Sequence, residues 1–266
     1  MSNFFQSNYK WWYCVSYHAK RVSAGAFGTI LQYVSHTLST LAIVYVWYKT
    51  GAGSEIITYL TVGKVFQMLS SLSYFGRLSD LIATGKITNY LLLPQSFFKV
   101  ELVNAVGVRV LKNVSGVVGA LIGVVIAGLA FRPILLPDLG NILILLLVFL
   151  PIAFVIQFFI GVTIGSSNFF VYNKRDFEGI SSSYLAALAI LTGSIIPLNQ
   201  LFYPEFFQSL PFAWIIHHPM QIYLGNYSNM EILYSVLGGL MWIFVLYILA
   251  KIVFKLGLKK NESVGL

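Results

Sequence analysis

The architecture of this chain depends on residues 74–94, which read YFGRLSDLIATGKITNYLLLP and lie between two apolar runs. Arg77, Asp80 and Leu81 stand at helical spacing, and Gly85 is expected to break that helix because glycine adopts a left-handed turn without a Cβ clash. A second short element is expected before a proline, and its residues are Lys86, Thr88, Asn89, Tyr90 and Pro94. A short element between two membrane spans is suited to receive force from a partner outside the bilayer. A plain connecting loop with an interfacial helix fits the same pattern.

The composition predicts an integral membrane protein. Of the 266 residues, 58% are hydrophobic and 10% are charged, whereas soluble domains carry about 25% charged residues. The net charge of +8 fits basic residues held on the cytoplasmic side of a membrane better than it fits nucleic-acid binding. The single cysteine, Cys14, excludes a disulfide within the chain and a cysteine metal cage.

Six apolar runs predict an all-α fold with six transmembrane helices in one domain, residues 1–266. Residues 4–21 combine many aromatic side chains with basic ones, which predicts an amphipathic helix in the headgroup layer. A half-polar segment, 97–113, precedes the third span, and a compact charged loop is expected at 174–178. The predicted spans are 22–48, 56–76, 114–131, 140–165, 180–196 and 232–250, with a change of direction possible at Pro151.

The distribution of Lys and Arg predicts the orientation. Nearly all of them fall in the terminal segments and in the loops after the second and fourth spans, while Lys49 and Arg132 lie on the other side. Because basic residues concentrate in cytoplasmic loops, we expect a multi-pass protein of the cell membrane with both termini in the cytoplasm.

Residues 197–225 are apolar but interrupted by prolines. Neither 206–210 nor 212–218 can cross a hydrocarbon core that requires about 20 helical residues. We therefore predict two re-entrant helices that dip into the outer leaflet and form an external lid or gate. The residues of this predicted gate are Pro197, Pro204, Pro211, Phe212, Pro219 and Gly225. The neighbouring His217 and His218 would point about 100° apart on a helix, so no metal site is expected there.

Two charged residues are candidates for the translocation path or for a subunit interface. Lys64 interrupts the second predicted span, and a charge within the membrane is by default a functional hypothesis. Snorkelling of its long side chain to the headgroups is the competing interpretation. Glu101 is expected at the inner interface beside Lys99.

Taken together, these features resemble the permease subunits of type-2 ABC exporters, in particular small six-span permeases without a fused ATPase. The resemblance rests on residues 81–94, LIATGKITNYLLLP, and on the segment that begins with GSIIP at 193–197. Thr88 stands where the family usually has an acidic residue, and Asn199 and Gln200 also depart from its pattern. The resemblance implies a coupling helix in 77–94 that docks on a separate ATPase, and a second permease, identical or homologous, beside membrane lipids.

On this interpretation the chain itself is not an enzyme and holds no cofactor, since ATP and Mg bind the partner ATPase. An ion-coupled secondary transporter that uses Lys64 and Glu101 as coupling charges is the alternative. Inverted-repeat carriers should show two similar halves, and the proline-rich segment has no counterpart in the first half. A membrane enzyme or assembly factor acting on lipid is a third hypothesis, for which no nucleophile or metal motif is present in the sequence.

Overall fold

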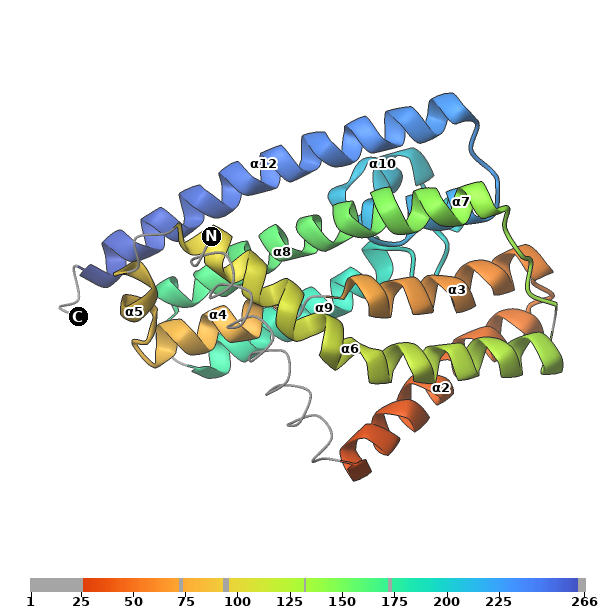
Figure 1. Cartoon of the computed structure of the whole chain (residues 1–266), viewed down its shortest axis with the longest axis horizontal. Coiled ribbons are helices and arrows are strands. Elements are labelled where there is room, and N and C mark those ends of the chain that lie inside the picture. The colour runs from red at the N-terminus through yellow and green to blue at the C-terminus, as the bar shows by residue number, and fades with distance from the viewer. Residues whose placement is uncertain (1–25, 72–73, 93–95, 132, 172–173, 263–266) are drawn as a thin grey trace, which may run out of the picture.

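A computed structural model describes residues 26–71, 74–92, 96–131, 133–171 and 174–262, and these residues form helices and turns without a strand. The helices run roughly along one axis and make an elongated bundle (Figure 1). The predicted interfacial helix at 4–21 lies outside the described residues. The predicted all-α class is therefore confirmed for the part of the chain that the structure describes.

Three segments are long and apolar enough to cross a membrane, and they are Ile30–Lys49, Leu139–Phe170 and Asn229–Lys260. Two shorter apolar helices, Gly116–Ala130 and Gly179–Leu191, accompany them. These segments support a membrane-embedded protein, whereas a topology of six spans stays a prediction.

The first half of the bundle contains α2 (Ala26–Lys49), α3 (Ser54–Ser70) and α6 (Phe97–Ala130). The prediction that the second span reaches residue 76 is wrong, because Ser71 is extended and α3 ends at Ser70. The half-polar segment 97–113 is not a separate element, since α6 runs through it for 34 residues, about 51 Å at 1.5 Å per residue. A helix of that length exceeds a hydrocarbon core of about 30 Å, so its polar first turns can stand outside the core.

The fourth predicted span continues through Pro151. It is built from α7 (Leu139–Ile144), a wider π-helical turn (Leu145–Phe149) and α8 (Leu150–Ser166), followed by a 3-10 turn (Ser167–Phe170). The wide turn lies just before Pro151, and such turns let a helix accommodate a proline that cannot donate a backbone hydrogen bond. Figure 1 shows α7 and α8 following one another along the bundle without a reversal.

The last two long helices are α9 (Lys174–Leu191) and α12 (Asn229–Glu262). The charged loop predicted at 174–178 is wrong, since these residues form the first turns of α9. The fifth span was predicted to reach residue 196, but α9 ends at Leu191 and Gly193 takes a positive φ of 81°. The helix α12 extends beyond the predicted 250 and carries lysines in its last turns. In these places polar residues stay helical, because a helix satisfies its own backbone hydrogen bonds on either side of the membrane boundary.

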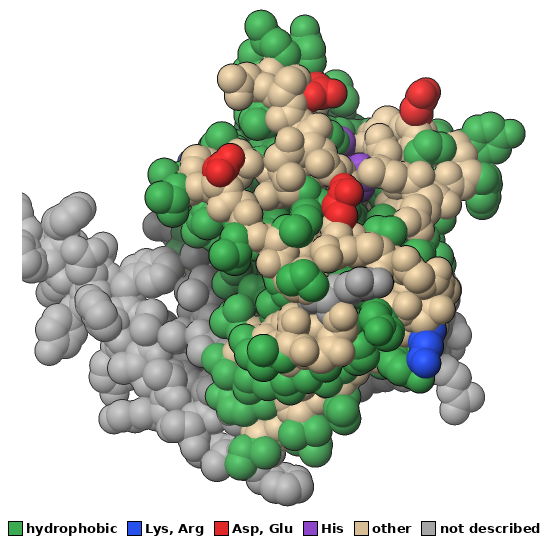
Figure 2. Space-filling model, turned by 90° about the vertical axis from the view of Figure 1, so that its right-hand side faces the viewer, with side chains coloured by type: hydrophobic (Ala, Val, Ile, Leu, Met, Phe, Trp, Pro, Cys, Tyr) green, Lys and Arg blue, Asp and Glu red, His purple; other side chains and the backbone are tan. Residues whose placement is uncertain are grey.

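Most charged side chains lie at one of the two ends of the bundle, with Lys64 in the middle of α3 as an exception. The end at the left of Figure 1 holds α4 (Tyr74–Ala83), α5 (Ile87–Leu91), the start of α6 and the end of α12. We call it the lysine-rich end, after Lys86, Lys99, Lys251, Lys255, Lys259 and Lys260. The opposite, acidic end carries Glu55, Asp138 and Glu231 at the starts of helices, and acidic side chains stand out across it in Figure 2.

The core forms around α8. Its buried side chains include Phe149 at the preceding turn, Ile156 and Phe158, and they pack against α3, α4 and α12. Short helices from residues 198–223 fill the remaining side of α8 in the acidic half. The helix α2 packs on α6 through small residues, where a Cβ on Gly119 would lie 2.8 Å from the carbonyl oxygen of Tyr33.

Candidate functional site: an exposed connector and a packed re-entrant segment

The connector between α3 and α6 consists of two short helices with a glycine between them. Gly85 has φ +68°, as the sequence predicts for a left-handed break, and α5 begins two residues later. The hydroxyl of Thr84 donates to the carbonyl of Asp80 at 2.6 Å, and that of Thr88 donates to the carbonyl of Gly85. The same two carbonyls also accept the backbone N–H groups of Thr84 and Thr88, so backbone and side-chain bonds hold the turn together.

The structure divides the predicted coupling residues into an outward set and an inward set. Asp80, Lys86 and Thr88 are exposed on the connector. Leu81 is half-buried against the core, so it supports the connector from below. Pro94 and the side chain of Asn89 lie outside the described residues.

Leu92, at the end of α5, is a surface residue that the sequence analysis missed. Its side chain is 82% exposed, next to Leu91 at 42%. The signal was present in the run of three leucines at 91–93, which begins at the last residue of α5. At the lysine-rich end these side chains are available for a contact from outside the bundle.

Arg77 joins the connector to the main bundle. Its Nε lies 3.0 Å from Oε2 of Glu101 on α6, and its Nη2 donates to the hydroxyl of Tyr90 on α5 at 3.0 Å. Glu101 is fully buried and also accepts from the Asn104 amide at 3.2 Å. A buried carboxylate requires such partners, since an unpaired one is strongly unfavourable. One guanidinium therefore links α4, α5 and α6.

The connector is also attached to α8 and the turn that follows it. The amide of Asn168 donates to the carbonyl of Ser79 at 3.1 Å, and Leu78 is fully buried between these elements. The buried face of α4 thus lies on the core, while its other face and α5 remain at the surface of the lysine-rich end.

Residues 197–225 form only short helices, as predicted. They are a 3-10 turn (Leu198–Gln200), α10 (Pro204–Ser209), a second 3-10 turn (Pro211–Ile215) and α11 (His217–Tyr223). The predicted second helix at 212–218 is replaced by the second turn and the start of α11. None of these elements is long enough to span a bilayer.

Most of this segment is core rather than a loose lid. Trp214 is buried in a notch of α12, where a Cβ on Gly239 would lie 2.8 Å from its ring, and its indole nitrogen donates to the carbonyl of Ser235 at 2.7 Å. On the other side, Ile216 and Met220 pack against Gly63 of α3. The segment is therefore clamped between α3 and α12 where glycines make room for it.

The predicted gate residues differ in their surroundings. Pro197, Pro211 and Pro219 are buried, Phe212 is half-buried, and Pro204 begins α10. Gly225 ends the segment with φ +75°, a conformation that favours glycine. The exposed part is the tip before and within α10, where Phe202, Tyr203 and Phe206 are 75%, 77% and 60% exposed.

The histidine pair is structural in its geometry. Nε2 of His218 lies 3.0 Å from the carbonyl of Gln208 and therefore donates, so Nδ1 accepts from the hydroxyl of Tyr227 at 2.8 Å. Nδ1 of His217 lies 3.4 Å from the hydroxyl of Tyr59. Burial lowers the pKa of His217 to about 3 and that of His218 to about 4, so both rings are neutral at pH 7.

Lys64 lies in the middle of α3. It follows Ser54 by about 15 Å and precedes Ser70 by about 9 Å along the helix. Its side chain is half-buried, and its ammonium lies 3.4 Å from the amide oxygen of Gln67. If α3 is the second predicted span, a lysine near its centre costs about 2.5–3.5 kcal/mol even on insertion scales.

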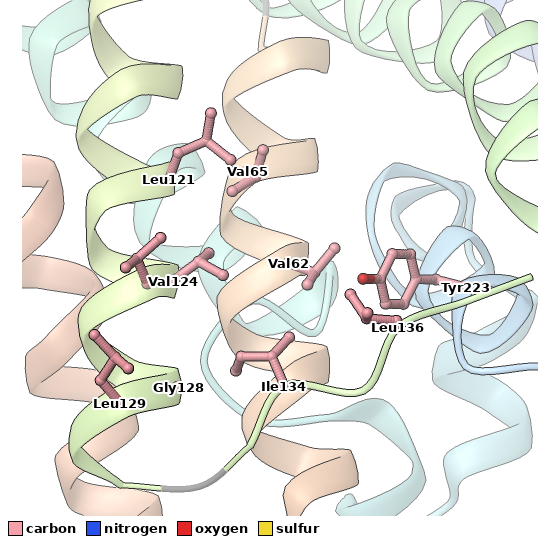
Figure 3. A pocket seen from close by; sticks show the side chains of 10 residues that line it. Val62, Val65, Leu121, Val124, Gly128, Leu129, Ile134, Leu136 and Tyr223 are labelled. Atoms are coloured by element: carbon pink, nitrogen blue, oxygen red, sulfur yellow. The ribbon is translucent and has the colours of Figure 1, made fainter. Parts of the chain in front are cut away.

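An apolar groove of about 460 Å³ lies between α3, α6 and the non-helical connection at 133–138 that follows α6 (Figure 3). Its walls are aliphatic, apart from the Tyr223 ring, whose hydroxyl donates to the carbonyl of Leu135 at 3.2 Å. The other lining residues are Val62, Val65, Leu121, Val124, Val125, Gly128, Leu129, Ile134 and Leu136. This groove can accept an apolar group but offers little polar recognition.

The comparison with protein families decides the identity. The model described as ABC-2 family transporter protein matches residues 47–265, which include every element above except most of α2. The chain belongs to the ABC-2 transporter family. This confirms the resemblance to an ABC-2 type permease, a class that generally transports without catalysing a reaction itself. Neither a curated protein nor a solved structure matches the chain.

Proposed function

We propose that this permease is the transmembrane subunit of an ATP-driven exporter, working with separate ATPase subunits and with a second permease, identical or homologous. The main support for this proposal is the α4–Gly85–α5 connector, an exposed pair of helices fixed to the bundle. The family match over residues 47–265 includes this connector. ATP and Mg belong to the partner ATPase in this proposal.

The connector has the properties that force transmission requires. Its outer face presents Asp80, Lys86 and Leu92 to a partner, and its inner face is joined to α6 and α8 through Arg77 and Leu78. A push on α5 would pass through the Arg77 guanidinium to α6, because a short charge-assisted hydrogen bond resists displacement. We therefore place the ATPase contact at this face of the lysine-rich end.

The proposal of a second permease is supported by the filled centre of the chain. Trp214, His217 and Met220 are buried where the acidic halves of α3, α8 and α12 converge. In the part of the chain that the structure describes, these side chains occupy the place that a path through a single subunit would need. A path between two subunits requires no such opening.

The ATPase contact is tested by co-expressing the tagged permease with a candidate ABC ATPase subunit, such as one found to be encoded beside its gene. Leu92→Arg should reduce the amount of ATPase retained by about tenfold, equivalent to about 1.4 kcal/mol, since a charge would replace a buried apolar contact. Leu136→Arg is the matched control, because Leu136 is 89% exposed at the acidic end. Equal retention by the parent and Leu92→Arg would exclude α5 from the contact.

The orientation in the cell membrane is tested by cysteine labelling after Cys14→Ser. Single cysteines at Ser209 and Asn226 should react with an impermeant maleimide on intact cells, since both residues are exposed in the acidic half. Cysteines at Lys86 and Lys255 should react only after permeabilisation. The reverse pattern would invert the proposed topology and move the ATPase contact to the wrong side.

A further inference from the structure

Lys64 stands where an uncompensated positive charge is least tolerated. The charge-free stretch of α12 from Ile232 to Ala250 begins at the acidic end, where α3 also begins. It spans about 28 Å, close to the thickness of a hydrocarbon core. At about 15 Å from the start of α3, Lys64 is therefore near the bilayer midplane.

No acid neutralises Lys64 among the residues that the structure describes. The one ion pair found there joins Arg77 and Glu101 at the lysine-rich end. The ionisable group within electrostatic reach of Lys64 is His36 of α2, which is itself a base. The interaction between these two groups leaves the positive charge without a counterion.

The polar side chains described near Lys64, Gln67 and His36, carry no negative charge. Gln67 directs its amide oxygen at the ammonium, 3.4 Å away, so its amide nitrogen points elsewhere. The ring of His36 lies where Gly116 of α6 lets the helices approach, since a Cβ there would be 3.4 Å from Nε2. Neither an amide oxygen nor a histidine ring supplies the negative charge that the ammonium lacks, so the position favours a carboxylate or phosphate.

The half-buried side chain of Lys64 can still be reached from outside the bundle. A small inorganic anion does not enter hydrocarbon, because its loss of hydration is too unfavourable. The anion that arrives at this depth must therefore carry apolar groups of its own. A phospholipid of the bilayer holds its headgroup near the surface, about 15 Å away, whereas a compound crossing the membrane passes the midplane.

We propose that Lys64 binds the carboxylate or phosphate of an anionic amphiphile as it crosses the membrane. This inference rests on the proposed export function and names the class of its cargo. Lys64 neutralises the head, while the aliphatic side chains of the surrounding helices accommodate the apolar part.

The site is tested on the full-length chain in nanodiscs of neutral phosphatidylcholine. The probes are a pyrene-labelled fatty acid and its methyl ester, which differ in charge but share the same tail. The parent should bind the acid at least about tenfold more tightly than the ester, which corresponds to about 1.4 kcal/mol. Lys64→Met should abolish this preference, whereas Lys64→Arg should retain it. Lys49→Met, at the end of α2, is the matched control and should also retain it.

Equal affinity of the parent for acid and ester would overturn the proposal without recourse to any variant, so a poorly folded Lys64→Met does not prevent the test. Persistence of the full preference in folded Lys64→Met would overturn it as well.

Nanodiscs containing phosphatidylglycerol distinguish the source of the anion. Unchanged binding of the fatty acid in these nanodiscs supports an amphiphile that crosses the membrane. If phosphatidylglycerol competes with the acid in a way that depends on Lys64, the ligand is a membrane lipid and the assignment to a crossing cargo is overturned. Binding is measured without an ATPase, so failure of the exporter complex and failure of this site are separate results.

Discussion

The connector 74–92 and the re-entrant segment 197–225 are both made of short helices, yet they are fixed to the bundle in different ways. The connector has one buried face and an exposed one, and a single guanidinium joins it to α6. The re-entrant segment enters glycine notches on α3 and α12, with Trp214 buried between them. An element that is joined to its neighbours by a polar link can move as a rigid body. An element whose side chains interdigitate with its neighbours cannot be displaced by small steps, because close packing does not deform gradually. The difference indicates that most of the predicted gate is fixed within the core of the bundle, whereas the connector keeps an exposed outer face.

The largest expected effect is on the stability of the packing between the re-entrant segment and α12. Gly239→Leu would place a Cβ 2.8 Å from Ile152 and from the Trp214 ring, where the helix and the re-entrant segment leave no room to separate. We expect a loss of about 3 kcal/mol or failure to accumulate as folded protein, the upper range for overpacking. Gly28→Leu on α2, with nothing within 4 Å of the added Cβ, is the control for fluorescence-detected size exclusion. A normal profile for Gly239→Leu would mean that the segment moves away from α12.

An intermediate effect is expected at the polar link. Arg77→Leu leaves the fully buried Glu101 carboxylate without its cation and should destabilise the protein by about 2 kcal/mol. This is below the range for fully buried pairs, because the Arg77 side chain is 41% exposed. Adding Glu101→Gln should restore part of the lost stability, which is measured by thermal melting of the detergent-solubilised protein.

The link should matter more for coupling than for folding. In the ATPase complex, the recovered double variant should still hydrolyse ATP but should lose stimulation by cargo. Full stimulation in the double variant would indicate that α4 and α5 transmit motion by another contact, such as the one between Asn168 and Ser79.

The smallest expected effect compares one glycine from each region. Gly85→Ala and Gly225→Ala both force an alanine into a left-handed conformation, with φ +68° and +75°. Each should cost about 1–2 kcal/mol if the turn is rigid. We expect the cost at Gly85 to be the smaller, since an added Cβ there meets nothing within 4 Å, whereas one at Gly225 would contact the Asn141 side chain at 3.8 Å. Melting temperatures measure the difference, and an equal loss would show that the two turns are equally constrained.

The sequence by itself determined the membrane class, the family and the two places where the helical pattern is interrupted. Composition and the spacing of charges carry that information, because the free energy of placing a residue in lipid depends mainly on its own side chain. The break at Gly85 was readable for the same reason, since the left-handed conformation that glycine tolerates is a local property.

Only the tertiary structure decided which of those residues face outward. Glu101 was expected at the inner interface beside Lys99, and no partner was predicted for it; the structure pairs it with Arg77, from which 24 residues of chain separate it. The proline-rich segment was predicted as a lid, but glycines on α3 and α12 admit Trp214 and Met220 into the core. These contacts join residues far apart in the chain, and such pairings depend on how helices pack, which the local pattern of a single sequence does not encode.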